Sequence, residues 1–136
     1  MAKMTIGLSS SSIDKLTGLG VMLSGAAADD IECEVYVLVN AAHVFLKNNP
    51  LNDFVSTNGQ SADEFKESCE KCSTPSWIEF IEQAKEFTEV KVYICSLAGK
   101  LWGGEKKEDF IDLVDDFCGI GQYLDSAQEA DLHISI

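Results

Sequence analysis

Short apolar runs alternate along the chain with segments in which apolar residues recur every three or four positions. The apolar runs predict four strands, at Thr5–Leu8, Cys33–Val39, Val90–Cys95 and Asp131–Ile136. The second run, CEVYVLV, is almost wholly apolar or β-branched. That composition is typical of a parallel strand that is covered on both faces.

The segments with helical periodicity lie between these strands. They predict helices at Ile13–Ala28, Trp77–Phe87, Asp109–Cys118 and Tyr123–Ala130, with a shorter helix from Asn40 to about Pro50. The serine run Ser9–Ser12 is suited to cap the first of these, and Pro75 is expected in the first turn of the second. Residues 51–74 are polar and have the least regular pattern.

This alternation of strands and helices predicts the α/β class. We expect a three-layer αβα arrangement with a mostly parallel sheet of about four to five strands. The length of 136 residues suits one domain, so residues 1–136 are interpreted as a single unit.

Charge narrows the range of partners. The chain carries 23 acidic and 10 basic residues, a formal net charge of −13, without a basic stripe. Such a field repels phosphate backbones and anionic lipids, so neither nucleic acid nor a membrane surface is an expected partner. No apolar run approaches the length of about 18 residues that a membrane span needs, and the N-terminal sequence lacks a signal-peptide pattern. The expected location is the cytoplasm.

The carboxyl ends of three predicted strands carry polar or reactive side chains. Parallel sheets bind ligands beyond these ends, so Ser10 and Ser11, Asn40 and His43, and Cys95 with Ser96 and Leu97 are candidates to line one crevice. His43 could act there as a general base, or it could be a merely exposed or capped histidine. The serine run lacks the glycines and lysine of a P-loop.

Five cysteines are present: Cys33, Cys69, Cys72, Cys95 and Cys118. The odd number favours reduced thiols over a disulfide framework. Cys95 stands where a strand meets a small-residue turn. There it is either a small buried hydrophobe or a thiolate that backbone N–H groups stabilise. Cys33 lies in a strand and Cys118 on the apolar face of a predicted helix, so both are interpreted as core residues.

Cys69 and Cys72 form an isolated CxxC pair in the polar segment. A structural zinc site would need two more ligands in a second close pair, and the sequence offers none, so no metal and no cofactor is expected. The pair is either an inert feature of a loop or a mobile auxiliary dithiol that resolves a persulfide by disulfide exchange.

The segment from Trp77 to Ile136 resembles the DsrE/DsrF-like family of sulfur-relay proteins, in particular the small DsrE-like proteins once labelled peroxiredoxin-related. The resemblance is carried by VKVYIC, SLAGKLWG, KKEDFIDLV and CGIGQYLDSAQEADLHISI. It implies that Cys95 accepts sulfane sulfur as a persulfide or thiosulfonate and passes it to a partner protein. The CxxC pair has no counterpart in this family pattern.

Two other functions stay open on the sequence. The chain could be a non-catalytic binding or scaffold subunit of a sulfur-relay complex, or a small-molecule module that binds a nucleotide-like ligand in the same crevice. The resemblance also implies a homo-oligomer, with a trimer favoured and a hexamer possible. Trp77, Phe80, Trp102 and Phe110 are expected to add the apolar surface for such an assembly.

Overall fold

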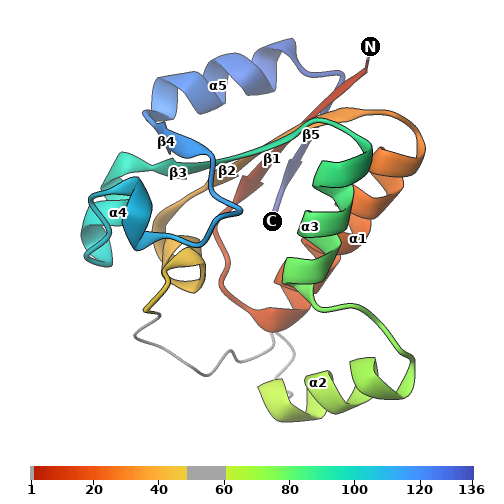
Figure 1. The fold of residues 1–136 in the computed structure, drawn as a ribbon. Coiled ribbons are helices and arrows are strands. Elements are labelled where there is room, and N and C mark those ends of the chain that lie inside the picture. The colour runs from red at the N-terminus through yellow and green to blue at the C-terminus, as the bar shows by residue number, and fades with distance from the viewer. Residues whose placement is uncertain (1, 49–60) are drawn as a thin grey trace.

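The computed structural model describes residues 2–48 and 61–136. These residues form an α/β fold around a five-stranded, all-parallel sheet with the strand order β4-β3-β2-β1-β5 (Figure 1). The predicted class and the parallel sheet are therefore confirmed. The strands are β1 (Lys3–Leu8), β2 (Glu32–Val37), β3 (Val90–Cys95), β4 (Asp116–Cys118) and β5 (Leu132–Ser135).

Helices cover both faces of the sheet. The helices α1 (Ile13–Ala28) and α3 (Trp77–Phe87) pack together on one face, and α5 (Ile120–Glu129) covers the other (Figure 1). Gly20 of α1 permits the close approach of the first pair, because a Cβ atom there would stand 2.6 Å from the Cβ of Phe80. At the carboxyl edge of the sheet lie the 3₁₀ helix η1 (Val39–Phe45) and the short helix α4 (Ser96–Leu101).

The main core lies between the sheet and the pair α1 and α3. The central strands contribute fully buried side chains, and so does the inner face of α1: Ile6, Leu8, Val35, Val37, Val92, Ile94, Leu16, Leu19 and Leu23. Trp77 and Phe110, which were expected to add exposed apolar surface, are only 6% and 1% exposed. The sequence pattern identified both as apolar, but only the packing shows that one domain hides them.

The predicted helix over residues 109–118 is wrong. Only residues 107–109 form a 3₁₀ turn; Phe110 then forms an antiparallel bridge with Leu46, and β4 follows. The reason is that this segment pairs with β3. The backbone N–H of Asp115 donates to the carbonyl of Val92 at 2.8 Å, so this segment satisfies its hydrogen bonds across the sheet instead of within a helix. The periodic apolar residues still face the core.

The polar segment was predicted to be irregular, but its second half is helical. Helix α2 (Ala62–Lys71) begins after Ser61, whose hydroxyl accepts a hydrogen bond from the Glu64 N–H at 3.2 Å. A helix exposed on most sides has few apolar residues, so its pattern resembles that of a loop. Pro75 lies one residue before Ser76, the N-cap of α3, and not in the first turn. Residues 51–60 and the predicted helix end at Pro50 lie outside the described residues.

The described helices include none that is long and apolar enough to cross a membrane.

Candidate functional site

A crevice of about 550 Å³ lies at the carboxyl edge of the sheet. The strand order, which the sequence left open, places the ends of β1, β2 and β3 side by side, and the end of β4 joins them. The crevice is lined by Ser9, Leu38, Val39, Cys95, Ser96, Leu97, Ala98, Cys118, Gly119 and Ile120. These lining residues include no charged side chain. As far as the described residues form it, the crevice is therefore an uncharged cavity in a protein of net charge −13.

Cys95 is the last residue of β3 and the N-cap of α4. Because β3 pairs with β2 on one side and β4 on the other, the backbone that carries this thiol is held from both sides. The side chain is half-buried and opens into the crevice. The predicted small-residue turn after Cys95 is instead the first turn of α4.

Helix α4 is anchored against the rest of the site. A Cβ atom on Gly99 would stand 2.5 Å from the carbonyl oxygen of Gly104, so only glycine permits this approach of the helix to the following loop. At the start of the helix the hydroxyl of Ser96 donates to the carbonyl of Cys118 at 3.3 Å. The indole N–H of Trp102, just after the helix, donates to the carbonyl of Val39 at 3.1 Å.

Cys118 ends β4 and pairs in register with Cys95. Its position on a strand corrects the predicted helix face, while its predicted burial is confirmed at 5% exposure. Burial, together with the nearby Cys95 and Asp116, raises the pKa of the Cys118 thiol to about 11. This thiol is therefore protonated at neutral pH.

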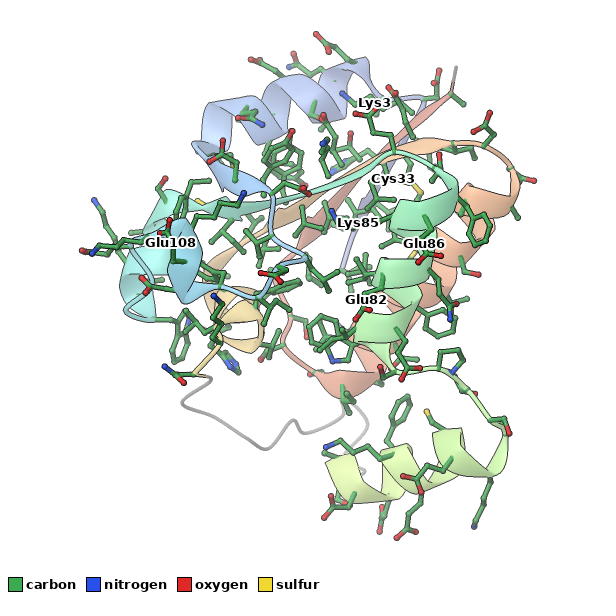
Figure 2. The ribbon with its side chains drawn as sticks, in the orientation of Figure 1. Lys3, Cys33, Glu82, Lys85, Glu86 and Glu108 are labelled. Atoms are coloured by element: carbon green, nitrogen blue, oxygen red, sulfur yellow. The ribbon has the colours of Figure 1, made fainter. Side chains whose placement is uncertain are left out.

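Cys33 lies in β2, in the core between the sheet and the helices α1 and α3, as predicted (Figure 2). Burial, reinforced by the charge of Glu32, raises the pKa of its thiol to about 11. Among the three cysteines on the strands, Cys95 is the one with a partly exposed side chain.

Of the other residues that the sequence predicted to line the crevice, some line it and some do not. Ser96 and Leu97 line the crevice, whereas Ser10, Ser11, Asn40 and His43 are not among its lining residues. The Ser10 hydroxyl accepts a local hydrogen bond from the Ser12 N–H at 3.1 Å. His43 is 2% exposed, with its ring 4.8 Å from that of Trp102, so the expectation of an exposed histidine is wrong. Its place is in the core, because η1 folds inward beneath α4.

Sequence reasoning missed the residues that β4 and the chain around it bring to the crevice. Gly119 and Ile120 follow β4, and recognition of the CGIG turn as the end of a strand could have identified them. Val39 was assigned to the end of the second strand, but it has a φ angle of 37°, in the left-handed region that β-branched residues rarely adopt. Strain of this kind tends to occur at functional sites.

The CxxC pair lies elsewhere. Cys69 is in the last turn of α2 and Cys72 is its C-cap, so the pair sits at a helix end rather than in the predicted loop. Cys69 borders a different groove, between α1, α2 and the start of α3. Helix α2 is well separated from α4 in Figure 1. The described residues contain no cluster of side chains that could hold a metal ion.

A polar cluster lies beneath α5. The carboxylate of Glu34 accepts hydrogen bonds from Ser126, from Tyr36 at 3.0 Å and from the Lys3 ammonium at 3.0 Å. Burial by itself would raise the pKa of Glu34, but these hydrogen bonds and the Lys3 charge outweigh it and lower the pKa. The Thr5 hydroxyl extends the network to Ser126 at 2.7 Å. The cluster fixes α5 on the sheet.

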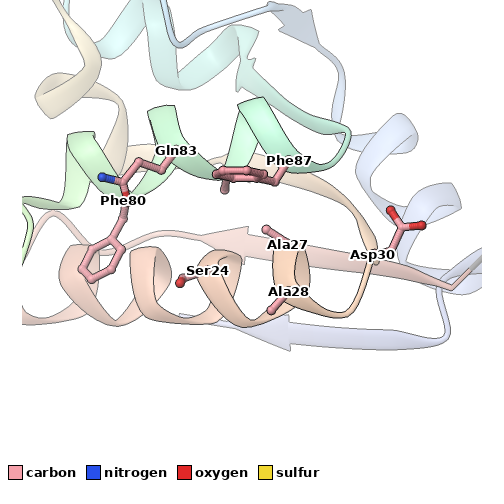
Figure 3. Close-up of a pocket in the computed structure, with 8 residues that line it drawn as sticks. Ser24, Ala27, Ala28, Asp30, Phe80, Gln83 and Phe87 are labelled. Atoms are coloured by element: carbon pink, nitrogen blue, oxygen red, sulfur yellow. The ribbon is translucent and has the colours of Figure 1, made fainter.

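Another hollow lies between α1 and α3, on the face of the sheet opposite α5 (Figure 3). Its volume is about 400 Å³. Its walls are mostly small or aromatic, including Ala27, Ala28, Phe80 and Phe87, with Asp30 at one end (Figure 3). Phe87 is 73% exposed. The lining residues include neither a thiol nor a histidine, so the crevice around Cys95 remains the candidate for chemistry.

The chain matches no model of a known protein family, and a search of curated proteins found no relative by sequence.

Proposed function

We propose that this protein is a sulfur carrier or sulfurtransferase of the DsrE/DsrF-like type. In this proposal Cys95 accepts sulfane sulfur as a persulfide or thiosulfonate and passes it to a partner protein. The observation that carries it is the position of Cys95, a partly exposed thiol at the end of a central strand, opening into an uncharged crevice. The sequence resemblance around this cysteine also supports the proposal.

The chemistry needs only a reactive thiolate and a sulfane donor. With tetrathionate, the Cys95 sulfur attacks an inner sulfur, the bond between the two inner sulfurs breaks, and thiosulfate leaves with the electron pair. The product is a thiosulfonate on Cys95. An attack on the sulfane sulfur of a polysulfide leaves a persulfide in the same way. The sheet holds the thiol in place, so a donor or acceptor must approach through the crevice.

The lining of the crevice favours a sulfur ligand over a nucleotide. A phosphate-bearing ligand calls for basic side chains or a glycine-rich loop, and the lining residues provide neither. Apolar and uncharged polar walls suit a polarisable sulfur chain and limit access of water to it. The nucleotide-like binding module is therefore the weaker alternative.

The decisive experiment measures the intact mass of the protein after incubation with tetrathionate or polysulfide. The wild type is expected to gain one thiosulfonate or at least one sulfur atom, and peptide mapping is expected to assign the modification to Cys95. Cys95→Ser should lose this modification, whereas the matched variant Cys33→Ser, which alters a buried strand cysteine, should retain it. Labelling of Cys95→Ser to the same extent as the wild type would contradict the assignment to Cys95, whereas a wild type that gains no sulfur would favour the scaffold subunit.

We also propose that the protein assembles as a homo-oligomer, with a trimer favoured and a hexamer possible. Exposed apolar side chains surround the crevice: Val39 is 46% exposed, Leu97 62% and Ile120 54%. A rim of this kind suits protein contact, either with further copies of the chain or with a relay partner. Light scattering at micromolar concentration tests the assembly, and a monomer would contradict it. A thiol that must stay reduced also suits a cytoplasmic location.

A further inference from the structure

Two thiols of this protein face one crevice. Cys95 and Cys118 are register partners on the adjacent parallel strands β3 and β4, and both line the same cavity. Directly paired residues of neighbouring strands project to the same face of a sheet. Both side chains accordingly pack in one apolar cluster with Tyr36 and Tyr123.

This spacing is compatible with a disulfide. Neighbouring strands lie about 4.8 Å apart. That separation falls within the range of roughly 4.4–6.8 Å between Cα atoms that disulfides span. The other strand cysteine has no such partner, because Cys33 pairs in register with Val90 and Met4.

We propose that Cys118 is a resolving thiol for Cys95: the two close to an internal disulfide, and this closure expels sulfide from a Cys95 persulfide. The persulfide step rests on the proposed function. The closure itself rests only on the pairing of the two cysteines.

The step balances without an external oxidant. The Cys118 sulfur bonds to the Cys95 Sγ, the bond from Cys95 Sγ to the outer sulfur breaks, and the outer sulfur leaves with the electron pair. The Cys118 thiol loses its proton, and the outer sulfur departs as hydrosulfide. The sulfane sulfur is thus reduced to sulfide while the two cysteines are oxidised to the disulfide. A small thiol such as glutathione can then reduce the disulfide and restore both thiols.

The burial of Cys118 suits it to react with Cys95 inside the protein. At 5% exposure it is shielded from bulky reagents, while Cys95 beside it is partly open. Its raised pKa keeps it protonated at neutral pH, so a thiol proton is present to leave with the expelled sulfur. The slow reaction of a neutral thiol leaves time for a partner protein to take the sulfur first. Cys118 therefore acts as a discharge route for a persulfide that no acceptor collects.

The first experiment tests closure without any sulfane sulfur. A Cys69→Ser/Cys72→Ser background removes the CxxC thiols, and this protein is incubated with oxidised glutathione. Cys95 is expected to form a mixed disulfide, which Cys118 then displaces, releasing glutathione. Peptide mapping should find a Cys95–Cys118 disulfide and a protein lighter by two hydrogen atoms. A lasting glutathione adduct on Cys95, or two free thiols, overturns the proposal.

The second experiment uses polysulfide on the same background and on the matched Cys118→Ala variant. The parent should lose its Cys95 persulfide with release of one sulfide per disulfide formed. The variant should retain the persulfide at least about tenfold longer, because its resolving thiol is absent. Equal lifetimes overturn the role of Cys118 but leave the loading of Cys95 intact. Conversely, oxidised glutathione could close the Cys95–Cys118 disulfide in a protein that polysulfide never loads. That result contradicts the proposed function but supports the pairing of the two thiols.

Discussion

Asp115 is expected to be the residue on which the position of β4 depends. Its carboxylate accepts from the Lys85 ammonium at 2.7 Å and from the Val92 N–H at 2.8 Å. Lys85 also donates to the carbonyl of Val90 at 3.0 Å, so this contact joins α3, β3 and the start of β4 (Figure 2 labels Lys85). Since β4 is only three residues long, its pairing with β3 covers only three register positions. Asp115→Ala should therefore loosen β4 and with it Cys118.

The expected loss in free energy of unfolding follows from the interactions that Asp115→Ala removes. The Lys85 and Asp115 side chains are 22% and 29% exposed, so their ion pair is partly screened and contributes about 1 kcal/mol. The Val92 N–H in addition loses its acceptor, which costs about 1–2 kcal/mol in a half-buried position. Asp115→Ala should thus lower the free energy of unfolding by about 2–3 kcal/mol. Asp115→Asn keeps an acceptor oxygen and should lose only about 1 kcal/mol.

Urea unfolding at one fixed protein concentration measures these values, with the slope against urea expected to stay unchanged. Asp112→Ala is the matched control, because it removes the same charge from an exposed position three residues earlier. It should change the free energy of unfolding by less than about 0.5 kcal/mol. Alkylation of Cys118 should be faster in Asp115→Ala than in this control. If the two variants unfold at the same urea concentration, the contact does not hold β4.

Two further predictions concern α4 and the polar cluster. Gly99→Ala should lower the free energy of unfolding by about 1–3 kcal/mol, because its Cβ would meet the Gly104 backbone. Gly25→Ala in α1, where an added Cβ meets nothing, should raise it by about 0.5–1 kcal/mol. Thermal unfolding of the two variants measures both changes. The pKa of Glu34 is lowered on folding, so the stability it contributes is present above about pH 4.5 and lost as the pH falls further. Glu34→Gln should flatten this acid-side dependence in urea titrations, and an unchanged profile would refute it.

The sequence by itself determined the class of the fold and the order of its main elements. The run from Cys33 to Val39 predicted a parallel strand covered on both faces, and the apolar periodicity from Ile13 to Ala28 predicted the bounds of α1. It also indicated that Cys95 ends a strand at the sheet edge where ligands bind. These features are local: each follows from the spacing of apolar residues over one or two turns or along one strand.

The features that only the tertiary structure decided depend on contacts between residues far apart in the sequence. Residues 109–118 have a helical pattern, yet their backbone N–H and C=O groups find partners on β3 and on Phe45 and Lys47, and that alternative cannot be read from periodicity. The same pairing places Cys118 beside Cys95. His43 is buried because η1 folds beneath α4, which no local signal predicts. Local spacing predicts most of the apolar positions that face the core, whereas long-range hydrogen bonding decides which of them become neighbours. This is why the second thiol of the crevice emerges only from the fold.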